Sequence, residues 1–236
     1  KENMPHIWCP GCGNGILMHD VIRAIHSLGL NRDRVCIVSG IGCSSRAAGY
    51  MNFSTVHTTH GRAIPFATGV KLADPTLEVI VITGDGDLAA IGGNHFIHAC
   101  RRNIGLTVVV FNNEIYGMTG GQMAPTTLLG MKTATTPYGR DPRLNGYPYK
   151  IAEMMAHLDG ATYITRQSVH TAANVRKCKK AIRKAFENSM AGNGFSLVEV
   201  VATCNSGWKM SPVAANEWLA QNMLPYYPLG DIKSNE

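Results

Sequence analysis

Two short polar motifs could together bind a metal ion and a phosphate group. Gly-Asp-Gly-Asp (84–87) and Asn-Asn-Glu-Ile (112–115) each follow an apolar run of the kind that forms a strand. Mg²⁺ prefers oxygen ligands and usually shares them with phosphates. The Asp85 carboxylate, the Asn113 amide oxygen and the Ile115 backbone carbonyl could supply three ligands. The sequence therefore predicts a magnesium–diphosphate site; for the first motif alone, the simpler alternative is a tight turn that caps a helix.

Four of the seven cysteines form a second candidate site. Cys9 and Cys12 belong to a Cys-Pro-Gly-Cys-Gly motif ahead of the first expected helix, Cys43 follows the first expected strand, and Cys204 follows the last. Loops are the usual place for ligands that a scaffold carries. Four thiolates can bind a [4Fe–4S] cluster or a structural zinc ion, and the spacing does not distinguish between them.

The other three cysteines have a simpler interpretation. Cys36 lies in an expected strand, Cys100 in an expected helix and Cys178 on a basic helical face, so we expect buried or incidental thiols. An odd cysteine count without a secretory signal argues against a disulfide scaffold. No apolar run reaches the roughly 18 residues of a membrane-spanning helix. We therefore expect a cytoplasmic protein that does not bind membranes.

The elements that must position these motifs alternate between strand and helix, as in a doubly wound α/β fold with a mostly parallel sheet. The expected strands are continuous runs of Val, Ile and Leu, typical of strands buried on both faces. They are 35–39, 78–83, 106–111, 162–165 and 196–201. The expected helices are 16–28, 64–72, 89–102, 149–158, 169–188 and 213–222. Such sheets bind ligands at the carboxyl ends of their strands, where both polar motifs are expected.

We predict one domain over residues 1–236, with an N-terminal cluster-binding loop. The segment 119–149 is rich in Gly, Pro, Thr and Tyr and has no clear period, so it is expected to be an irregular loop that is either functional or disordered. The tail after Leu224 reads Pro-Tyr-Tyr-Pro-Leu-Gly and is predicted to be an extended arm.

One basic segment contributes to the net charge of +6. The densest basic run lies within 176–184, on an expected helix. Nucleic-acid binding would need a basic stripe with interleaved aromatic side chains, so we expect that the chain does not bind nucleic acid. A solvated helix face is the simpler interpretation of the run, and a docking patch for an acidic electron-transfer protein is the alternative.

Taken together, the motifs resemble those of one family. They are Cys-Pro-Gly-Cys-Gly (9–13), Gly-Cys-Ser-Ser (42–45), His-Gly-Arg-Ala (60–63), Gly-Asp-Gly-Asp (84–87), Gly-Gly-Asn-His (92–95) and Asn-Asn-Glu-Ile-Tyr-Gly-Met-Thr-Gly-Gly-Gln (112–122). This combination is similar to the β subunits of 2-oxoacid:ferredoxin oxidoreductases, and most similar to the members that act on 2-oxoglutarate. Residues 132–201 match only in their pattern of elements.

The resemblance implies a thiamine-diphosphate-binding domain that holds its cofactor through Mg²⁺ and carries a [4Fe–4S] cluster. It implies cluster ligands at Cys9, Cys12, Cys43 and Cys204. It implies Mg²⁺ ligands at Asp85, Asn113 and Ile115. It implies cofactor contacts at Ile41, Gly42, Cys43, Ser44, His60, Gly86, Asp87, Gly117, Met118 and Thr119. Cys43 would then belong to two sites, which suits an electron that passes from the cofactor to the cluster.

Two residues are predicted to act in the reaction itself. Arg46 follows Gly-Cys-Ser-Ser, where the family can place a basic residue that faces the substrate, and it could pair with the distal carboxylate of 2-oxoglutarate. The alternative for Arg46 is an ordinary surface arginine. His60 is expected beside the cofactor because of its motif; the alternative is a core histidine with satisfied hydrogen bonds.

The implied activity is oxidative decarboxylation of a 2-oxoacid to an acyl-CoA and CO₂, with electrons passed through the cluster to ferredoxin. Thiamine enzymes need a Glu against the aminopyrimidine ring, and this chain holds no second domain to supply one. An α subunit is therefore expected to provide that Glu and much of the substrate pocket, with γ and δ subunits as further candidates.

Three alternatives stay open at this point. The substrate could be pyruvate or a branched-chain 2-oxoacid in place of 2-oxoglutarate. The chain could belong to a non-redox thiamine carboligase or decarboxylase, although such chemistry needs no cysteine cluster. It could also be a non-catalytic zinc- or cluster-binding protein, although the two polar motifs argue against that class.

Overall fold

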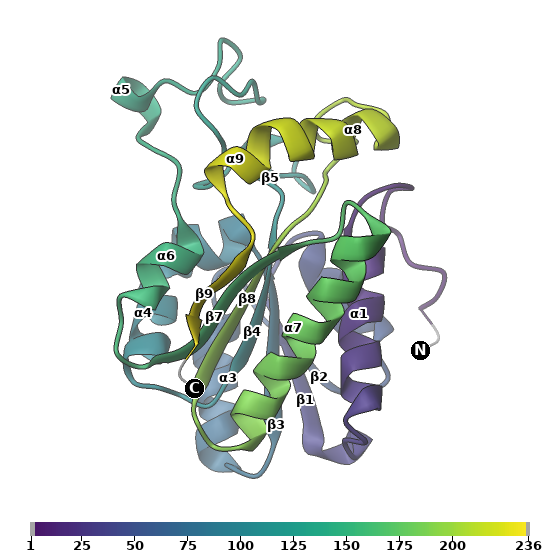
Figure 1. The fold of residues 1–236 in the computed structure, drawn as a ribbon, viewed down its shortest axis with the longest axis vertical. Coiled ribbons are helices and arrows are strands. Elements are labelled where there is room, and N and C mark those ends of the chain that lie inside the picture. The colour runs from purple at the N-terminus through teal and green to yellow at the C-terminus, as the bar shows by residue number, and fades with distance from the viewer. Residues whose placement is uncertain (1–2, 235–236) are drawn as a thin grey trace.

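A computed structural model describes residues 3–234, which form a three-layered α/β structure around one large sheet (Figure 1). The strands are β1 (Val35–Ser39), β2 (Ser54–His57), β3 (Glu78–Gly84), β4 (Thr107–Asn112), β5 (Ile115–Tyr116), β6 (Gln122–Met123), β7 (Ala161–Ser168), β8 (Phe195–Val201) and β9 (Gly230–Ser234). The helices are α1 (Asn14–Ser27), α2 (Ala47–Tyr50), α3 (Ala63–Ala73), α4 (Gly93–Arg101), α5 (Pro142–Asn145), α6 (Ile151–Ala156), α7 (Ala172–Met190), α8 (Pro212–Trp218) and α9 (Leu224–Tyr226).

The main sheet has seven strands in the order β2-β1-β3-β4-β8-β7-β9. Every neighbouring pair is parallel except β7 and β9, so the predicted mostly parallel, doubly wound sheet is confirmed. From β1 the chain first adds β2 on one side and then β3 on the other. The loops after β1 and β3 therefore diverge, and such a switch point is where open α/β sheets bind ligands.

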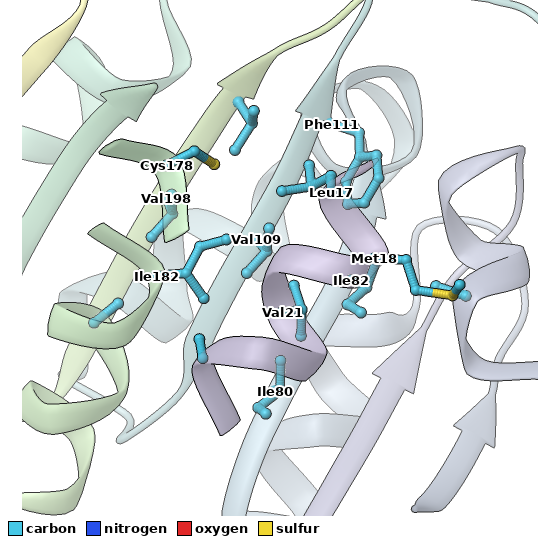
Figure 2. Close-up of a cluster of buried hydrophobic side chains, with 14 of the residues drawn as sticks. Leu17, Met18, Val21, Ile80, Ile82, Val109, Phe111, Cys178, Ile182 and Val198 are labelled. Atoms are coloured by element: carbon cyan, nitrogen blue, oxygen red, sulfur yellow. The ribbon is translucent and has the colours of Figure 1, made fainter. Parts of the chain in front are cut away.

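One face of the sheet packs against α1 and α7, which lie side by side (Figure 1). Leu17 and Val21 of α1 and Ile182 of α7 are buried against Ile80 and Val109 of the sheet (Figure 2). The apolar residues on α7 recur every three to four positions, so one side of the helix is buried and the other is exposed. This packing fixes α1, and with it the cysteine loop (residues 9–12) that precedes α1.

The opposite face of the sheet is covered by α3, α4 and α6. Its core joins Val81, Val108 and Leu197 of the strands to Phe96 of α4 and Ile151 of α6. Strands β1, β4 and β8 are buried along their whole length. Burial on both faces explains why these strands read as continuous apolar runs.

Five of the seven strands of the main sheet match predicted ones, and the other two were missed. Strand β2 has the sequence Ser-Thr-Val-His and is partly exposed at one edge, so it carries no apolar run. Strand β9 closes the other edge by pairing antiparallel with β7. The predicted C-terminal arm is wrong in part, because Leu224–Tyr226 forms a helical turn and Tyr227 is fully buried. Residues 230–234 are extended, as part of the sheet.

A buried ion network explains why the tail is attached. The guanidinium of Arg166 on β7 donates from Nε to Glu199 at 2.9 Å and from Nη1 to Glu153 at 2.8 Å. It also donates to the carbonyl of Pro228 at 3.3 Å and lies 5.1 Å from the ring centroid of Tyr227. A buried Arg needs such partners. The network therefore ties the tail to β7 and β8.

Asp20 on α1 gives a stability prediction. It is 2 % exposed, and its Oδ2 has no hydrogen-bond partner in the described part of the chain. Burial raises the pKa of Asp20 to about 6, although the positive charges of Lys179 and Arg23 act to lower it. The folded state thus favours the protonated acid, so stability falls as pH rises from about 4 through 6. Asp20→Asn should therefore stabilise the chain by about 1–2 kcal/mol at pH 8 and little at pH 4. Urea unfolding at both pH values measures this, and an equal effect at both would contradict it.

Among residues 3–234, no helix combines the length and the apolar character that crossing a bilayer requires.

Candidate functional site

A pocket of about 160 Å³ lies at the switch point of the sheet, between the loops that follow β1, β2, β3 and β4. It brings together residues from four separate parts of the sequence. Its lining consists of Ile41, Gly42, Cys43, Ser44, His60, Gly84, Asp85, Gly86, Asp87, Phe111, Asn113, Ile115, Tyr116, Gly117, Met118 and Thr119. Every residue predicted to touch the cofactor or Mg²⁺ is in this set, whereas Arg46 is not.

Asp85 is the buried acid of the pocket. Its side chain is 2 % exposed, and the hydroxyl of Thr126 donates a hydrogen bond to Oδ2. Burial raises the pKa of Asp85 to about 7, and the charge of Glu199 adds to the shift. A carboxylate in this position favours a bound cation, because no Lys or Arg side chain pairs with it in the described chain.

Glu114 is a second buried acid close to Asp85. It is fully buried, its backbone is left-handed (φ 60°), and neither carboxylate oxygen has a hydrogen-bond partner among residues 3–234. Burial, and then the charge of Asp85, raise the pKa of Glu114 well above its usual range. Two buried acids close together disfavour each other's ionised form. A divalent cation held by Asp85 and Asn113 would offset that repulsion, so the residues fit the predicted Mg²⁺.

Asn113 and Ile115 are held in place by local contacts. The Asn113 Oδ1 accepts from the Ile115 backbone N–H at 3.2 Å, and the Asn113 carbonyl accepts from Trp208 Nε1 at 3.2 Å. The neighbouring Asn112 donates to the buried Glu199 at 2.7 Å. The end of β4 is thus fixed on both sides, and Trp208 and Glu199 are supports that the sequence did not reveal.

Asp87 lines the pocket, and its carboxylate is hydrogen-bonded to three parts of the protein. Its Oδ1 lies 2.5 Å from His60 Nδ1 and accepts from the Gly61 N–H at 2.7 Å. Its Oδ2 accepts from the Thr83 hydroxyl at 2.8 Å. A Cβ on Gly40 would overlap the Asp87 carboxylate. Asp87 therefore joins the loops after β1, β2 and β3 and orients His60, whose ring is 40 % exposed.

Two glycines of the pocket are required by close neighbours. A Cβ at Gly86 would overlap the ring of Tyr116, whose hydroxyl donates to the Gly86 carbonyl at 3.2 Å. A Cβ at Gly117 would lie 2.9 Å from Cys204 Sγ and 4.0 Å from Cys43 Sγ. Residue 117 thus lies between the pocket and Cys204, and a side chain there would press on the Cys204 sulfur.

The four predicted cluster ligands influence each other electrostatically. Burial raises the pKa of Cys12 and Cys43 and raises that of Cys204 to about 12. The negative charges of the neighbouring cysteine thiolates add to each of these shifts. Thiolates that repel one another are stabilised by a shared metal centre, so the donor set suits iron or zinc. Within residues 3–234, no three His, Cys, Asp or Glu side chains are grouped as a ready-made site for a metal ion.

Residues beside these cysteines clamp their loops together. Trp8 Nε1 donates to the Cys43 carbonyl at 2.7 Å. Thr203 and Asn205, which flank Cys204, donate to the carbonyls of Gly11 and Pro10 at 3.2 and 3.1 Å. Supporting hydrogen bonds of this kind orient metal ligands. The clamp joins the cysteine loop to the loops after β1 and β8, and no sequence motif predicts it.

Arg46 is exposed, at the end of the turn that follows Cys43. Its charge lowers the pKa of the Cys43 thiol, against the larger raising effects of burial and of Cys12 and Cys9. Arg46 has no ion pair within the described part of the chain. Its predicted role toward a substrate therefore stays a prediction.

The irregular segment 119–149 is ordered around one side chain. The buried guanidinium of Arg140 donates to backbone carbonyls on both sides of the loop. The acceptors are Ala124, Pro125, Thr127, Asn145, Gly146 and Tyr147. The turn at 124–127 delivers Thr126 to Asp85, and the Thr127 hydroxyl donates to the Glu114 carbonyl. Arg140 thus supports the acid of the pocket from a distance.

Arg140→Lys should weaken binding of Mg²⁺ and thiamine diphosphate about 10-fold, because a lysine cannot bridge both sides of the loop and the Thr126–Asp85 contact loosens. Titration calorimetry measures the affinity, and limited proteolysis reports loosening of 124–147. Arg143→Lys is the matched control, because Arg143 is exposed on the same segment. Equal affinity in both variants would contradict the role of Arg140.

The comparisons with known proteins agree with this geometry. Residues 40–200 match the family "Thiamine pyrophosphate enzyme, C-terminal TPP binding domain". The fold and the pocket at its switch point therefore define a thiamine-diphosphate-binding domain.

Close relatives narrow the class further. The chain is 52% identical over 221 residues to the 2-oxoglutarate synthase subunit KorB of Archaeoglobus fulgidus, covering 94% of this chain and 78% of that one. It is 51% identical to the subunit of the same name from Methanocaldococcus jannaschii, with 86% and 71% covered. A solved 2-oxoglutarate:ferredoxin oxidoreductase from Magnetococcus marinus, with 2-oxoglutarate, coenzyme A and succinyl-CoA bound, is 31% identical with a TM-score of 0.86, covering 99% of this chain and 83% of that one. The chain belongs to the β subunits of the 2-oxoacid:ferredoxin oxidoreductases.

Proposed function

We propose that this chain is the cofactor- and cluster-carrying subunit of a cytoplasmic 2-oxoglutarate:ferredoxin oxidoreductase. The complex would convert 2-oxoglutarate and coenzyme A to succinyl-CoA and CO₂ and pass two electrons to ferredoxin. One observation carries the proposal: the pocket at the switch point collects all thirteen predicted cofactor and Mg²⁺ residues, and its Cys43 wall adjoins the other predicted cluster cysteines. The relatives named for 2-oxoglutarate support the choice of substrate.

Residues at the ends of β3 and β4 would hold the diphosphate. Asp85, Asn113 and the Ile115 carbonyl would supply hard oxygen donors of the kind that Mg²⁺ prefers when it helps to bind a diphosphate. Gly86 also lines the pocket, with the Tyr116 ring packed where a side chain of residue 86 would lie. Thiamine diphosphate, when bound, supplies the electron-accepting chemistry that lets a 2-oxoacid lose CO₂. The chain itself binds, orients and shields that group.

His60 would present a ring nitrogen to the bound cofactor or substrate. Nδ1 lies 2.5 Å from the Asp87 carboxylate, so Nε2 is the ring nitrogen left for a bound group. The ring also packs edge-on against Tyr116, with centroids 6.3 Å apart. These two contacts fix the position and the tilt of the ring. His60 would therefore present Nε2 at a constant position to a group in the pocket.

The other half of the site must come from a partner. A ligand pocket for a molecule of this size has a volume of about 300–1,000 Å³, whereas this one has about 160 Å³. An α subunit would supply the missing wall, including the Glu that contacts the pyrimidine ring, and γ and δ subunits would complete the complex. The purified chain alone is thus expected to be inactive, and turnover by the chain alone would refute this.

The proposal is tested on the purified complex. It should be brown, contain iron and acid-labile sulfide, and retain thiamine diphosphate after gel filtration. With coenzyme A and ferredoxin it should turn over 2-oxoglutarate faster than pyruvate or 2-oxoisovalerate. Colourless protein that contains zinc would refute the cluster, and preference for another 2-oxoacid would refute the substrate.

Arg46 offers a finer test of substrate choice. Arg46→Leu should raise the KM for 2-oxoglutarate about 10-fold or more, because a charge-assisted contact to the distal carboxylate is lost. The KM for pyruvate, which has no distal carboxylate, should not change. Steady-state kinetics with both substrates measures the difference. An unchanged KM for 2-oxoglutarate would leave Arg46 as a surface arginine.

A further inference from the structure

The predicted cluster lies close to the surface on one side. Cys9 is exposed, whereas Cys12, Cys43 and Cys204 are partly buried. Around the cysteine loop, apolar side chains face solvent: Ile7 is 66 % exposed, Ile16 is 43 % exposed, and Val213 is 68 % exposed. Val213 follows Pro212, against which Gly11 packs so closely that a Cβ would overlap it. The cysteine loop therefore reaches the protein surface on this side.

A cavity adjoins this loop and leads to a basic helix. It has a volume of about 500 Å³ and is lined by Gly11 and Gly13 of the N-terminal segment, Ile16 of α1, and Val175 and Arg176 of α7, among others. Figure 1 shows α7 lying alongside α1, with the two helices next to each other along the sheet. The first turns of α7 are therefore neighbours of the cysteine loop.

Three cations on α7 have no ion pair in the described chain. Arg176, Lys177 and Lys180 are exposed and make no salt bridge. The other basic residues of the helix are engaged: Arg183 pairs with Glu187, Lys184 with Asp231, and Lys179 lies near Asp20. One exposed acid, Glu217, directly follows Asn216 in the sequence, and Asn216 lines the cavity. Arg176 lines the cavity, whereas Lys177 and Lys180 line a second hollow along α7, next to the paired Lys184 and Asp231. The exposed side of α7 therefore carries a net positive charge.

We propose that Arg176, Lys177 and Lys180, here called the α7 face, together with the apolar rim of the cysteine loop, form the docking surface for ferredoxin. This inference rests on the proposed function, because it names where the electron acceptor of that reaction binds. An acidic electron carrier would match this basic face, since complementary charge steers encounter more than it adds affinity. Electron-transfer interfaces are small, below about 1,200 Å², which suits an apolar centre with a basic edge.

The test compares two charge-reversed complexes. One carries Arg176→Glu, Lys177→Glu and Lys180→Glu. The matched control carries Arg32→Glu, Arg101→Glu and Arg102→Glu, three exposed cations at the amino-terminal edge of the sheet, which change the net charge by the same amount. Each complex is assayed with 2-oxoglutarate and coenzyme A, with either ferredoxin or methyl viologen as acceptor.

The α7-face variant should raise the KM for ferredoxin at least 10-fold at low ionic strength and leave viologen reduction unchanged. Raising the salt concentration should weaken ferredoxin reduction by the wild type and reduce the difference between the two enzymes. The control variant should behave like the wild type. An unchanged KM, or equal losses in both variants, would overturn the docking surface.

Two further measurements keep the outcomes distinct. If the wild-type complex fails to reduce viologen with any 2-oxoacid, the proposed function fails, while ferredoxin binding measured by titration calorimetry still tests the surface. If the triple variant does not assemble, hydrogen exchange on the wild-type complex replaces it, with protection by ferredoxin expected in residues 172–181. Absence of protection there, or cross-links from α7 to another subunit of the complex, would overturn the proposal.

Discussion

Asp85→Asn should lower the affinity for Mg²⁺ and thiamine diphosphate by more than about 100-fold and abolish turnover, while making the cofactor-free protein more stable. The two effects have one cause. Asp85 is a buried carboxylate close to the buried acid Glu114, with no paired cation in the described chain. Removing its charge relieves repulsion in the empty site but removes a ligand that the filled site needs.

The measurement is made on the complex after cofactor removal with a chelator. Thermal unfolding should show a higher Tm for Asp85→Asn than for the wild type without cofactor, and this order should reverse when Mg²⁺ and thiamine diphosphate are added. Asp33→Asn is the matched control, because Asp33 is exposed in the turn before β1. A variant that still gains stability from the cofactor would rule out Asp85 as a ligand.

The sequence was informative about this site for a physical reason. Asp85, Asn113 and Cys43 each follow an apolar run, and in a parallel sheet the carboxyl ends of such runs meet at one edge. The local sequence pattern therefore predicted that residues far apart in the sequence lie together in the fold. The strands of the sheet centre were found for the same reason, because burial on both faces leaves an apolar run, whereas the edge strands β2 and β9 leave none.

The supports of the site could not be predicted in this way. Thr126 reaches Asp85, Trp8 reaches Cys43, and Arg140 fills the middle of its own loop. Each contact joins segments whose spacing depends on how an irregular chain folds, and neither period nor motif encodes that. A threonine or an arginine in a loop is also an ordinary surface residue in most sequences. Only the three-dimensional positions reveal that these residues act through the predicted ones.

The last prediction is that the cluster can be removed without loss of cofactor binding. Cys12→Ala should remove the cluster, with loss of brown colour and of ferredoxin reduction, and leave binding of thiamine diphosphate within about threefold of wild type, because Cys12 is not in the pocket lining. Cys178→Ala is the control, since Cys178 is a buried thiol on the side of α7 that faces the core.

Cys43→Ala should differ from Cys12→Ala in one respect. It should also remove the cluster, but cofactor binding should weaken about 10-fold, because Cys43 lines the pocket and its sulfur lies near Gly117. Iron content and visible absorption report the cluster, and titration calorimetry reports the cofactor. If both variants bound thiamine diphosphate equally well, Cys43 would not link the two centres. A cofactor defect confined to Cys43→Ala would instead identify one residue at which the pocket and the cluster meet.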